Sequence, residues 1–189
     1  GTWQLGDGTV LQAGNVDLSL PPLSPDGLSF QEVQLDAGAF DSAPVIFSTV
    51  GTYNGPDWVT TRHRATDSDS FELSLQEEEQ LGDTRHTTET VGFLAVADDS
   101  LDFSVSDNPG VTHNVSLDLM IDGAFFADMQ ETAGPDAAIV RSSYDGTTAE
   151  FEIQEDRSLD SETFHAPETV GVLSFGEDQG ILSGFEYIV

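Results

Sequence analysis

The sequence of 189 residues contains no cysteine and no lysine, and none of its apolar runs is long. Without cysteine the chain forms no disulfide and carries out no thiolate chemistry. No apolar run approaches the roughly twenty residues that a membrane-spanning helix needs, so we expect no membrane insertion. The chain opens with Gly1-Thr2-Trp3-Gln4 rather than with a basic and apolar leader, which indicates a segment processed or excised from a longer protein.

Positive charge is also scarce. Five arginines stand against 35 Asp and Glu residues, and the formal net charge is −30 at pH 7. Such a chain repels phosphate backbones and anionic lipids, so nucleic acid is excluded as a partner. Its carboxylates repel one another until salt screens them, since the Debye length falls to about 3 Å at 1 M salt. The composition indicates an extracellular or cell-surface protein of a salty environment, whose acidic coat either only maintains solubility or also gathers calcium.

The sequence contains two copies of one unit. Residues 86–96 match residues 165–175 at an offset of 79, and both segments carry the motif His-x-x-Glu-Thr-Val-Gly. Further blocks match in the same order at nearly the same spacing: 55–57 with 134–136, Arg62 with Arg141, 71–73 with 151–153, 33–36 with 115–118, and 16–18 with 101–103. The third of these matches implies one extra residue in a turn of the second copy. Such an ordered series of matches indicates a tandem duplication.

The pattern of each copy predicts strands. Apolar and polar residues alternate from Phe71 to Gln76, the period of two of a strand with one face in water. Residues 44–50 are rich in β-branched and aromatic types, and residues 91–96 are continuously apolar, as in a central strand. We expect an all-β fold of two tandem antiparallel β-sandwich units. The expected domains are residues 1–97 with an N-terminal strand extension and residues 98–189 with a C-terminal strand tail.

The repeated block, with Arg62 upstream, resembles a tandem domain family of secreted and cell-surface proteins from marine and salt-loving microbes. Domains of that family often accompany polysaccharide-acting modules. The block is also loosely similar to the H-type lectins, which are six-stranded antiparallel sandwiches that bind sugars without catalysis, so the resemblance implies H-type-lectin-like units. Those lectins commonly have Trp on the last strand, where this chain has Phe93 and Val172, and we transfer none of their sugar ligands. The resemblance covers residues 30–97 and 112–176.

The candidate ligand-binding residues are charged and aromatic side chains, most of them at matching positions of the two copies. They are Tyr53, Trp58, Arg62, His86, Glu89, Arg141, His165 and Glu168. The Arg, His and Glu residues either form an internal set of ion pairs that fixes strand register, or present donors to a sugar carboxylate, sulfate or hydroxyl. His86 and Glu89 are three residues apart, so they reach one site only if the strand begins after His86.

The aromatic candidates have two interpretations as well. Trp58 and Tyr53 either stack on sugar rings or fill the core. Trp58 directly follows the turn at residues 55–57, which favours exposure, and Ala137 takes its place in the second copy. If the chain binds a glycan, we therefore expect the site in the first copy.

The sequence predicts no cofactor, with calcium as the one alternative. Acidic loops offer oxygen ligands for a weak site of the extracellular type. The candidate metal ligands are Asp67, Asp69, Asp98, Asp99 and Asp102. They match neither the twelve-residue helix-loop-helix pattern nor the calcium-binding nonapeptide repeat.

Two classes of function remain open. The sequence has no nucleophile elbow, phosphate loop or zinc-protease motif, so we expect no enzyme. The first class is a non-catalytic extracellular carbohydrate-binding or cell-surface module with a glycan as partner. The second is a structural or adhesive extracellular subunit that binds neighbouring copies of itself head to tail, as in a filament. The terminal strand at 185–189 would then pair with a neighbouring sheet.

Overall fold

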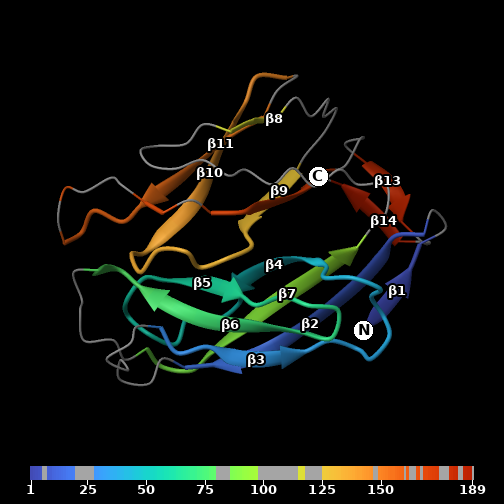
Figure 1. Ribbon diagram of the computed structural model, residues 1–189, viewed down its shortest axis with the longest axis horizontal. Coiled ribbons are helices and arrows are strands. Elements are labelled where there is room, and N and C mark those ends of the chain that lie inside the picture. The colour runs from blue at the N-terminus through green and yellow to red at the C-terminus, as the bar shows by residue number, and fades with distance from the viewer. Residues whose placement is uncertain are drawn as a thin grey trace.

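The computed structural model (Figure 1) describes residues 1–5, 8–19, 28–79, 86–97, 115–117, 125–146, 149–159, 161, 165–166, 168–174, 179–182 and 185–188. These residues form strands and turns without an α-helix, and their strand pairs are antiparallel. The all-β, antiparallel fold expected from the sequence is therefore confirmed. No helix in this described part is long and apolar enough to cross a membrane.

The first repeat forms two sheets that lie face to face in the lower half of Figure 1. One sheet has the order β1 (Thr2–Gln4), β2 (Val10–Leu18), β7 (Glu89–Ala97) and β4 (Val45–Val50). The other has the order β3 (Gln31–Gln34), β6 (Ser70–Glu77) and β5 (Val59–Arg64). β7 lies between β2 and β4, which is the central place that its apolar sequence predicts. β1 is an edge strand and forms the N-terminal extension.

The core of the first repeat lies between these sheets. Phe71, Leu73 and Leu75 of β6 are buried against Val91 and Phe93 of β7, and each such side chain contributes about 1.5–3 kcal/mol. The rings of Phe71 and Phe93 meet edge to face with centroids 5.2 Å apart.

The opposite face of β6 differs from the sequence expectation. Ser74 and Gln76 alternate with the core residues and were expected in water, yet both are buried. Ser74 Oγ donates to the carbonyl of Ser29 at 2.8 Å. Gln76 is covered by the second repeat, as described below.

The second repeat occupies the upper half of Figure 1, and its described strands repeat three pairings of the first. β9 (Phe125–Met129) pairs with β12 (Val170–Ser174) as β4 pairs with β7. β11 (Ala149–Glu155) pairs with β10 (Ala138–Tyr144) and with β8 (Val115–Leu117), as β6 pairs with β5 and β3. A core that includes Phe151 and Met129 lies among them. β13 (Gln179–Leu182) and β14 (Phe185–Ile188) form a hairpin with each other in the expected tail.

The hairpin register corrects one detail of the repeat alignment. Arg62 pairs with Ser74, and Arg141 pairs with Glu152, so β11 follows β6 at an offset of 78 and not 80. The turn between the paired strands is therefore one residue shorter in the second repeat, where the sequence match implied one residue more. By this register Gln154 takes the place of Gln76.

Candidate functional site

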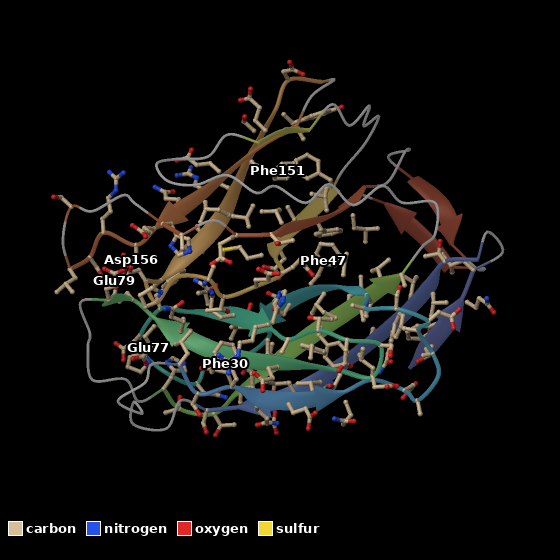
Figure 2. The ribbon with its side chains drawn as sticks, viewed as in Figure 1. Phe30, Phe47, Glu77, Glu79, Phe151 and Asp156 are labelled. Atoms are coloured by element: carbon tan, nitrogen blue, oxygen red, sulfur yellow. The ribbon has the colours of Figure 1, made fainter. Side chains whose placement is uncertain are left out.

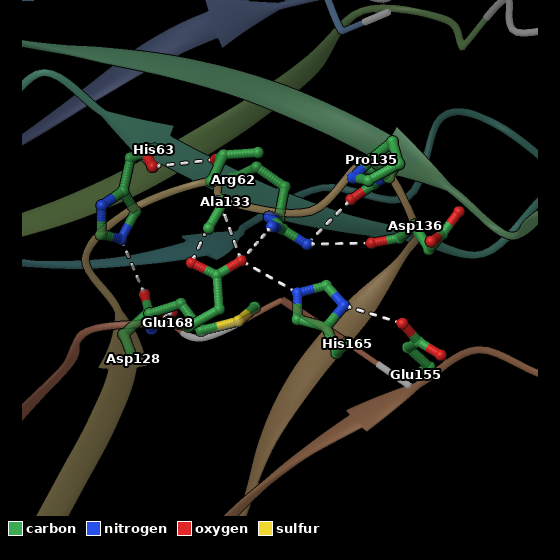
Figure 3. A network of polar contacts seen from close by, with 12 residues as sticks. Arg62, His63, Asp128, Ala133, Pro135, Asp136, Glu155, His165 and Glu168 are labelled. Carbon is green, nitrogen blue, oxygen red and sulfur yellow. Dashed lines mark hydrogen bonds and ion pairs between the residues drawn. The ribbon is translucent and has the colours of Figure 1, made fainter. Parts of the chain in front are cut away.

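In each repeat a buried histidine lies between two buried glutamates. In the second repeat, Nδ1 of His165 is 3.0 Å from Oε1 of Glu155, and Nε2 is 2.9 Å from Oε1 of Glu168 (Figure 3). Glu155 is the last residue of β11, whereas His165 and Glu168 precede β12 in a loop. The site therefore ties the β11 end to the start of β12.

The first repeat builds the same site. Nδ1 of His86 is 2.8 Å from Glu77, and Nε2 is 3.0 Å from Glu89. β7 begins at Glu89, so His86 lies before the strand. That is the condition under which the two motif residues can share a site.

The glycine of each Gly-Pro-Asp turn makes room for the histidine ring. A Cβ added to Gly134 would lie 2.8 Å from Cε1 of His165, and one added to Gly55 would lie 2.5 Å from Cε1 of His86. Real Cβ atoms do not approach carbon so closely. The turn motif and the His-x-x-Glu motif thus recur together because they are two halves of one packing arrangement.

Glu89 is ionised at ordinary pH. Its Oε2 accepts from the Thr52 hydroxyl at 2.5 Å, and its Oε1 accepts from the amides of residues 54 and 55 at 2.7 and 2.9 Å. These bonds, that from Thr52 most of all, lower the pKa of Glu89 to about 2. A carboxylate only accepts, so Nε2 of His86 donates to Glu89.

Glu168 has a different set of partners, because one of them comes from the first repeat. It accepts from the amide of Ala133 at 3.1 Å, and it forms a 2.8 Å ion pair with Nη2 of Arg62. Arg62 lies on β5, 106 residues earlier in the chain. This ion pair therefore joins the two repeats.

Arg62 is 1% exposed and makes further contacts at the junction (Figure 3). Its Nη1 donates to the carbonyl of Asp136 and to Oε1 of Gln76, both at 3.2 Å. Gln76 in turn donates to the carbonyl of Pro135 at 2.7 Å. Burial lowers the pKa of Arg62, and the nearby Glu168 carboxylate opposes that shift. Arg62 and Gln76 together hold the turn of the second repeat.

The second repeat also covers the free edge of β4. The side-chain amide of Gln130 accepts from the Ile46 amide at 2.8 Å and donates to the Ile46 carbonyl at 2.9 Å. Asp128 accepts from the Ser48 amide at 3.0 Å. An exposed strand edge can pair with other chains through its free backbone groups. Gln130 and Asp128 form hydrogen bonds with those backbone groups on the edge of β4. Gly171 permits this approach, because a Cβ there would lie 2.3 Å from Cγ1 of Val45.

Two more contacts flank the junction. Oγ1 of Thr132 donates to the carbonyl of His63 at 3.0 Å. At the other end, Asp156 accepts from the amide of Glu79 at 2.8 Å, and the two residues face each other across the repeats in Figure 2. Burial opposes ionisation of Asp156, but hydrogen bonds from Ser158 and from backbone amides hold its pKa below the usual value. These contacts add two hydrogen bonds between the repeats to those made by Arg62, Gln76, Asp128 and Gln130.

The other candidate ligand residues are at the surface. Tyr53 is 81% exposed, Trp58 is 47% exposed and Arg141 is exposed. Trp58 lines a hollow of about 320 Å³ whose wall is completed by the second repeat. Polar side chains in that wall include Glu78, Gln154 and Arg157. The sequence candidates thus divide into a buried Arg-His-Glu set and exposed residues, of which Trp58 lines the hollow and Tyr53 and Arg141 do not.

A larger groove of about 620 Å³ also runs between the repeats. Phe47 and Phe93 of the first repeat line it, with Phe126 and Ile139 of the second. Its lining is mostly apolar, so it offers a sugar few hydrogen-bonding groups.

Of the candidate calcium ligands, Asp67 and Asp69 are described and exposed. Oδ1 of Asp67 accepts from the amides of Asp69 and Ser70 at 2.8 Å, and these bonds lower the pKa of Asp67. Asp98, Asp99 and Asp102 lie outside the described residues. Within the described part, no three acidic or histidine side chains converge as metal ligands would. Calcium binding stays a prediction.

The described residues form an all-β protein of antiparallel sheets, in which hydrogen bonds and an ion pair connect the two sequence repeats. The chain is similar to halomucin of Haloquadratum walsbyi (strain DSM 16790 / HBSQ001), with 30% identity over 188 aligned residues. The match covers 93% of this chain and 2% of halomucin, so the chain spans a small part of that protein's length. No family model matches the chain, and no solved structure does.

Sequence reasoning missed the partners that complete the site. Glu77 and Glu155 were not among the candidates, although each ends the alternating strand pattern with a buried charge. Asp128 and Gln130 were missed as well, because their contacts are 80 and 84 residues away in the sequence. Their absence from the first repeat, which has Thr49 and Gly51 at those positions, was a usable signal.

Proposed function

We propose that the chain is a non-catalytic, extracellular structural module in which two sandwich units are joined into one body. The observation that carries this proposal is the buried Arg62–Glu168 pair, which connects β5 of one repeat to the His-Glu site of the other. The buried motif residues form hydrogen bonds with each other and with the turns. This favours the structural interpretation of the Arg, His and Glu positions over the ligand-binding one.

The net charge and the sequence similarity to halomucin support a high-salt environment outside the cell or at its surface. A net charge of −30 suits a protein exposed to high salt, where screening suppresses repulsion among its carboxylates. The similarity to halomucin of Haloquadratum walsbyi supports the same setting and a place outside the cell or at its surface.

Scanning calorimetry of the whole chain in about 2 M salt tests the proposal, because repulsion is then screened. If the repeats form one body, they unfold in one transition whose calorimetric and van't Hoff enthalpies agree. Arg62→Leu should split or broaden this transition. Two independent transitions in the natural chain, both unchanged by Arg62→Leu, would contradict the joined module.

A second candidate function is glycan binding in the hollow at Trp58. The specific observation is a half-exposed indole beside Gln154 and Arg157, because sugar-binding sites combine an aromatic platform with a few hydrogen-bonding groups. Arg157 would attract a glycan that carries carboxylate or sulfate groups.

A glycan array that includes acidic and sulfated glycans tests this second function. Binding should be lost in Trp58→Ala and retained in Trp3→Ala, which removes another indole that is 43% exposed. Equal binding by both variants would remove the hollow from consideration, and no binding to any glycan by the natural chain would leave only the structural function.

A further inference from the structure

The surface by which the first repeat holds the second has a counterpart in the second repeat. Nη1 of Arg141 donates to Oε1 of Gln154 at 2.7 Å, as Nη1 of Arg62 donates to Gln76. The two pairs occupy equivalent register positions in their hairpins. In the first repeat this pair is buried against the Gly134-Pro-Asp turn, whereas Arg141 is exposed.

The strand edge beside the pair is also repeated. Ser48 pairs with Phe93, and Ala127 pairs with Val172, so Phe125 and Ala127 of β9 occupy the positions of Ile46 and Ser48 on β4. The groups bound on β4 are backbone amides and a carbonyl, which every residue offers whatever its side chain. Among the described residues, no side chain is hydrogen-bonded to the backbone of Phe125 or Ala127.

The complementary face exists in the second repeat and is missing from the first. The first repeat has Thr49, Gly51 and Tyr53 where the second has Asp128, Gln130 and Thr132. The first repeat lacks the side chains that bind a strand edge. Its own residues also donate to the two acceptors that a partner's arginine and glutamine would use, the Glu89 carboxylate and the Pro56 carbonyl. The Thr52 hydroxyl donates to Glu89, and the Tyr53 hydroxyl donates to the Pro56 carbonyl at 3.2 Å. A second copy of this chain would therefore have no suitable face to offer.

We propose that the face formed by Arg141, Gln154 and the edge of β9 docks a further unit of the second-repeat type. That unit would present an Asp-x-Gln strand to the β9 edge, and a Gly-Pro-Asp turn and a buried Glu to Arg141. The fit is one of charge as well as shape, since an arginine with one described partner would meet a carboxylate. The inference rests on the proposed structural function and gives the resulting array a polarity, in which each unit holds the next.

The test uses the full chain extended by one unit, with residues 1–176 followed by residues 98–189, because residue 176 lies 79 positions after residue 97. Amide hydrogen exchange is measured at Phe125 and Ala127 in the natural and extended chains. Docking should slow exchange at both amides by at least about tenfold, which corresponds to about 1.4 kcal/mol. Unchanged rates in a folded extended chain would overturn the proposal.

Substitution of Arg141 provides the matched comparison. Arg141→Leu should leave the melting temperature of the natural chain nearly unchanged and should lower that of the extended chain. Arg64→Leu is the control, because Arg64 is half exposed and pairs with Glu72 within its own hairpin, so its effect should be equal in both chains. Equal small effects of Arg141→Leu in the two chains would contradict docking. If Arg62→Leu does affect the natural chain in that case, the proposed function survives and only the further unit is refuted.

A second variant keeps the test valid if the extended chain does not fold. In the full-length chain, residues 49–54 are replaced by the sequence of residues 128–133, which gives the first repeat the complementary face. Light scattering should then show head-to-tail association, and adding Arg141→Leu should return the chain to a monomer. A grafted chain that folds and stays monomeric up to about 100 μM, where micromolar contacts would be populated, would overturn the proposal.

Discussion

Replacing Arg62 by leucine should be among the most damaging single changes in this chain. The substitution removes an ion pair with Glu168 at 2.8 Å and two hydrogen bonds at 3.2 Å, and it leaves Glu168 buried without its counter-charge. The net worth of a buried ion pair is modest, but removing one partner typically costs about 3–5 kcal/mol. For a chain of this length, that loss corresponds to a fall in melting temperature on the order of 10 °C.

The repeat supplies the matched control. Arg141 is the same residue type at the equivalent position, but it is exposed, so Arg141→Leu should change stability by no more than about 0.5 kcal/mol. Urea unfolding of the two variants and the natural chain, followed by tryptophan fluorescence and circular dichroism in high salt, measures the difference. Equal effects of the two substitutions, or a cost below about 1 kcal/mol for Arg62→Leu, would refute the assignment of Arg62 as a buried link between the repeats.

Two further predictions rest on named contacts and one rests on net charge. Gly171→Ala should destabilise the chain by about 1–3 kcal/mol because its Cβ would overlap Val45, whereas Gly92→Ala at the equivalent position has open space and should be nearly neutral in the same urea assay. Glu89 has a pKa of about 2 in the folded state, below its unfolded value of 4.5, so its contribution is complete above pH 4.5 and is lost as the pH falls towards 2. An acid titration of stability should therefore be flatter between pH 4.5 and 2 for Glu89→Gln than for the natural chain, and parallel curves would show that the Glu89 contacts are absent. The melting temperature should also rise with salt until the carboxylates are screened at about 1 M. A salt-independent melting temperature would show that repulsion among the carboxylates does not destabilise the fold.

The sequence predicts those parts of the structure that rest on local patterns. Alternation around Phe71 and the apolar run at 91–96 indicate the strands, and the duplicated motifs locate the His-Glu sites. The junction could not be predicted, because Arg62 and Glu168 look identical in sequence to their equivalents Arg141 and Glu89. Which member of each pair is buried against the other repeat depends on how the repeats dock.

The burial of Gln76 could not be predicted from strand periodicity either. A period of two places it on the face opposite Phe71, and the sequence has no signal that this face is covered. The hairpin offset was misjudged for a related reason, because the apolar match of 71–73 with 151–153 is satisfied by a shift of two residues that keeps every side chain on its face.

The most direct test of the joined module is hydrogen exchange at the edge of β4. The amides of Ile46 and Ser48 are bound by Gln130 and Asp128 of the second repeat, whereas Phe125 and Ala127 occupy the same places on the edge of β9. We predict that Ile46 and Ser48 exchange at least about tenfold more slowly than Phe125 and Ala127, and that Gln130→Ala accelerates exchange at Ile46. Equal rates at the two edges, unaffected by Gln130→Ala, would contradict a rigid junction between the repeats.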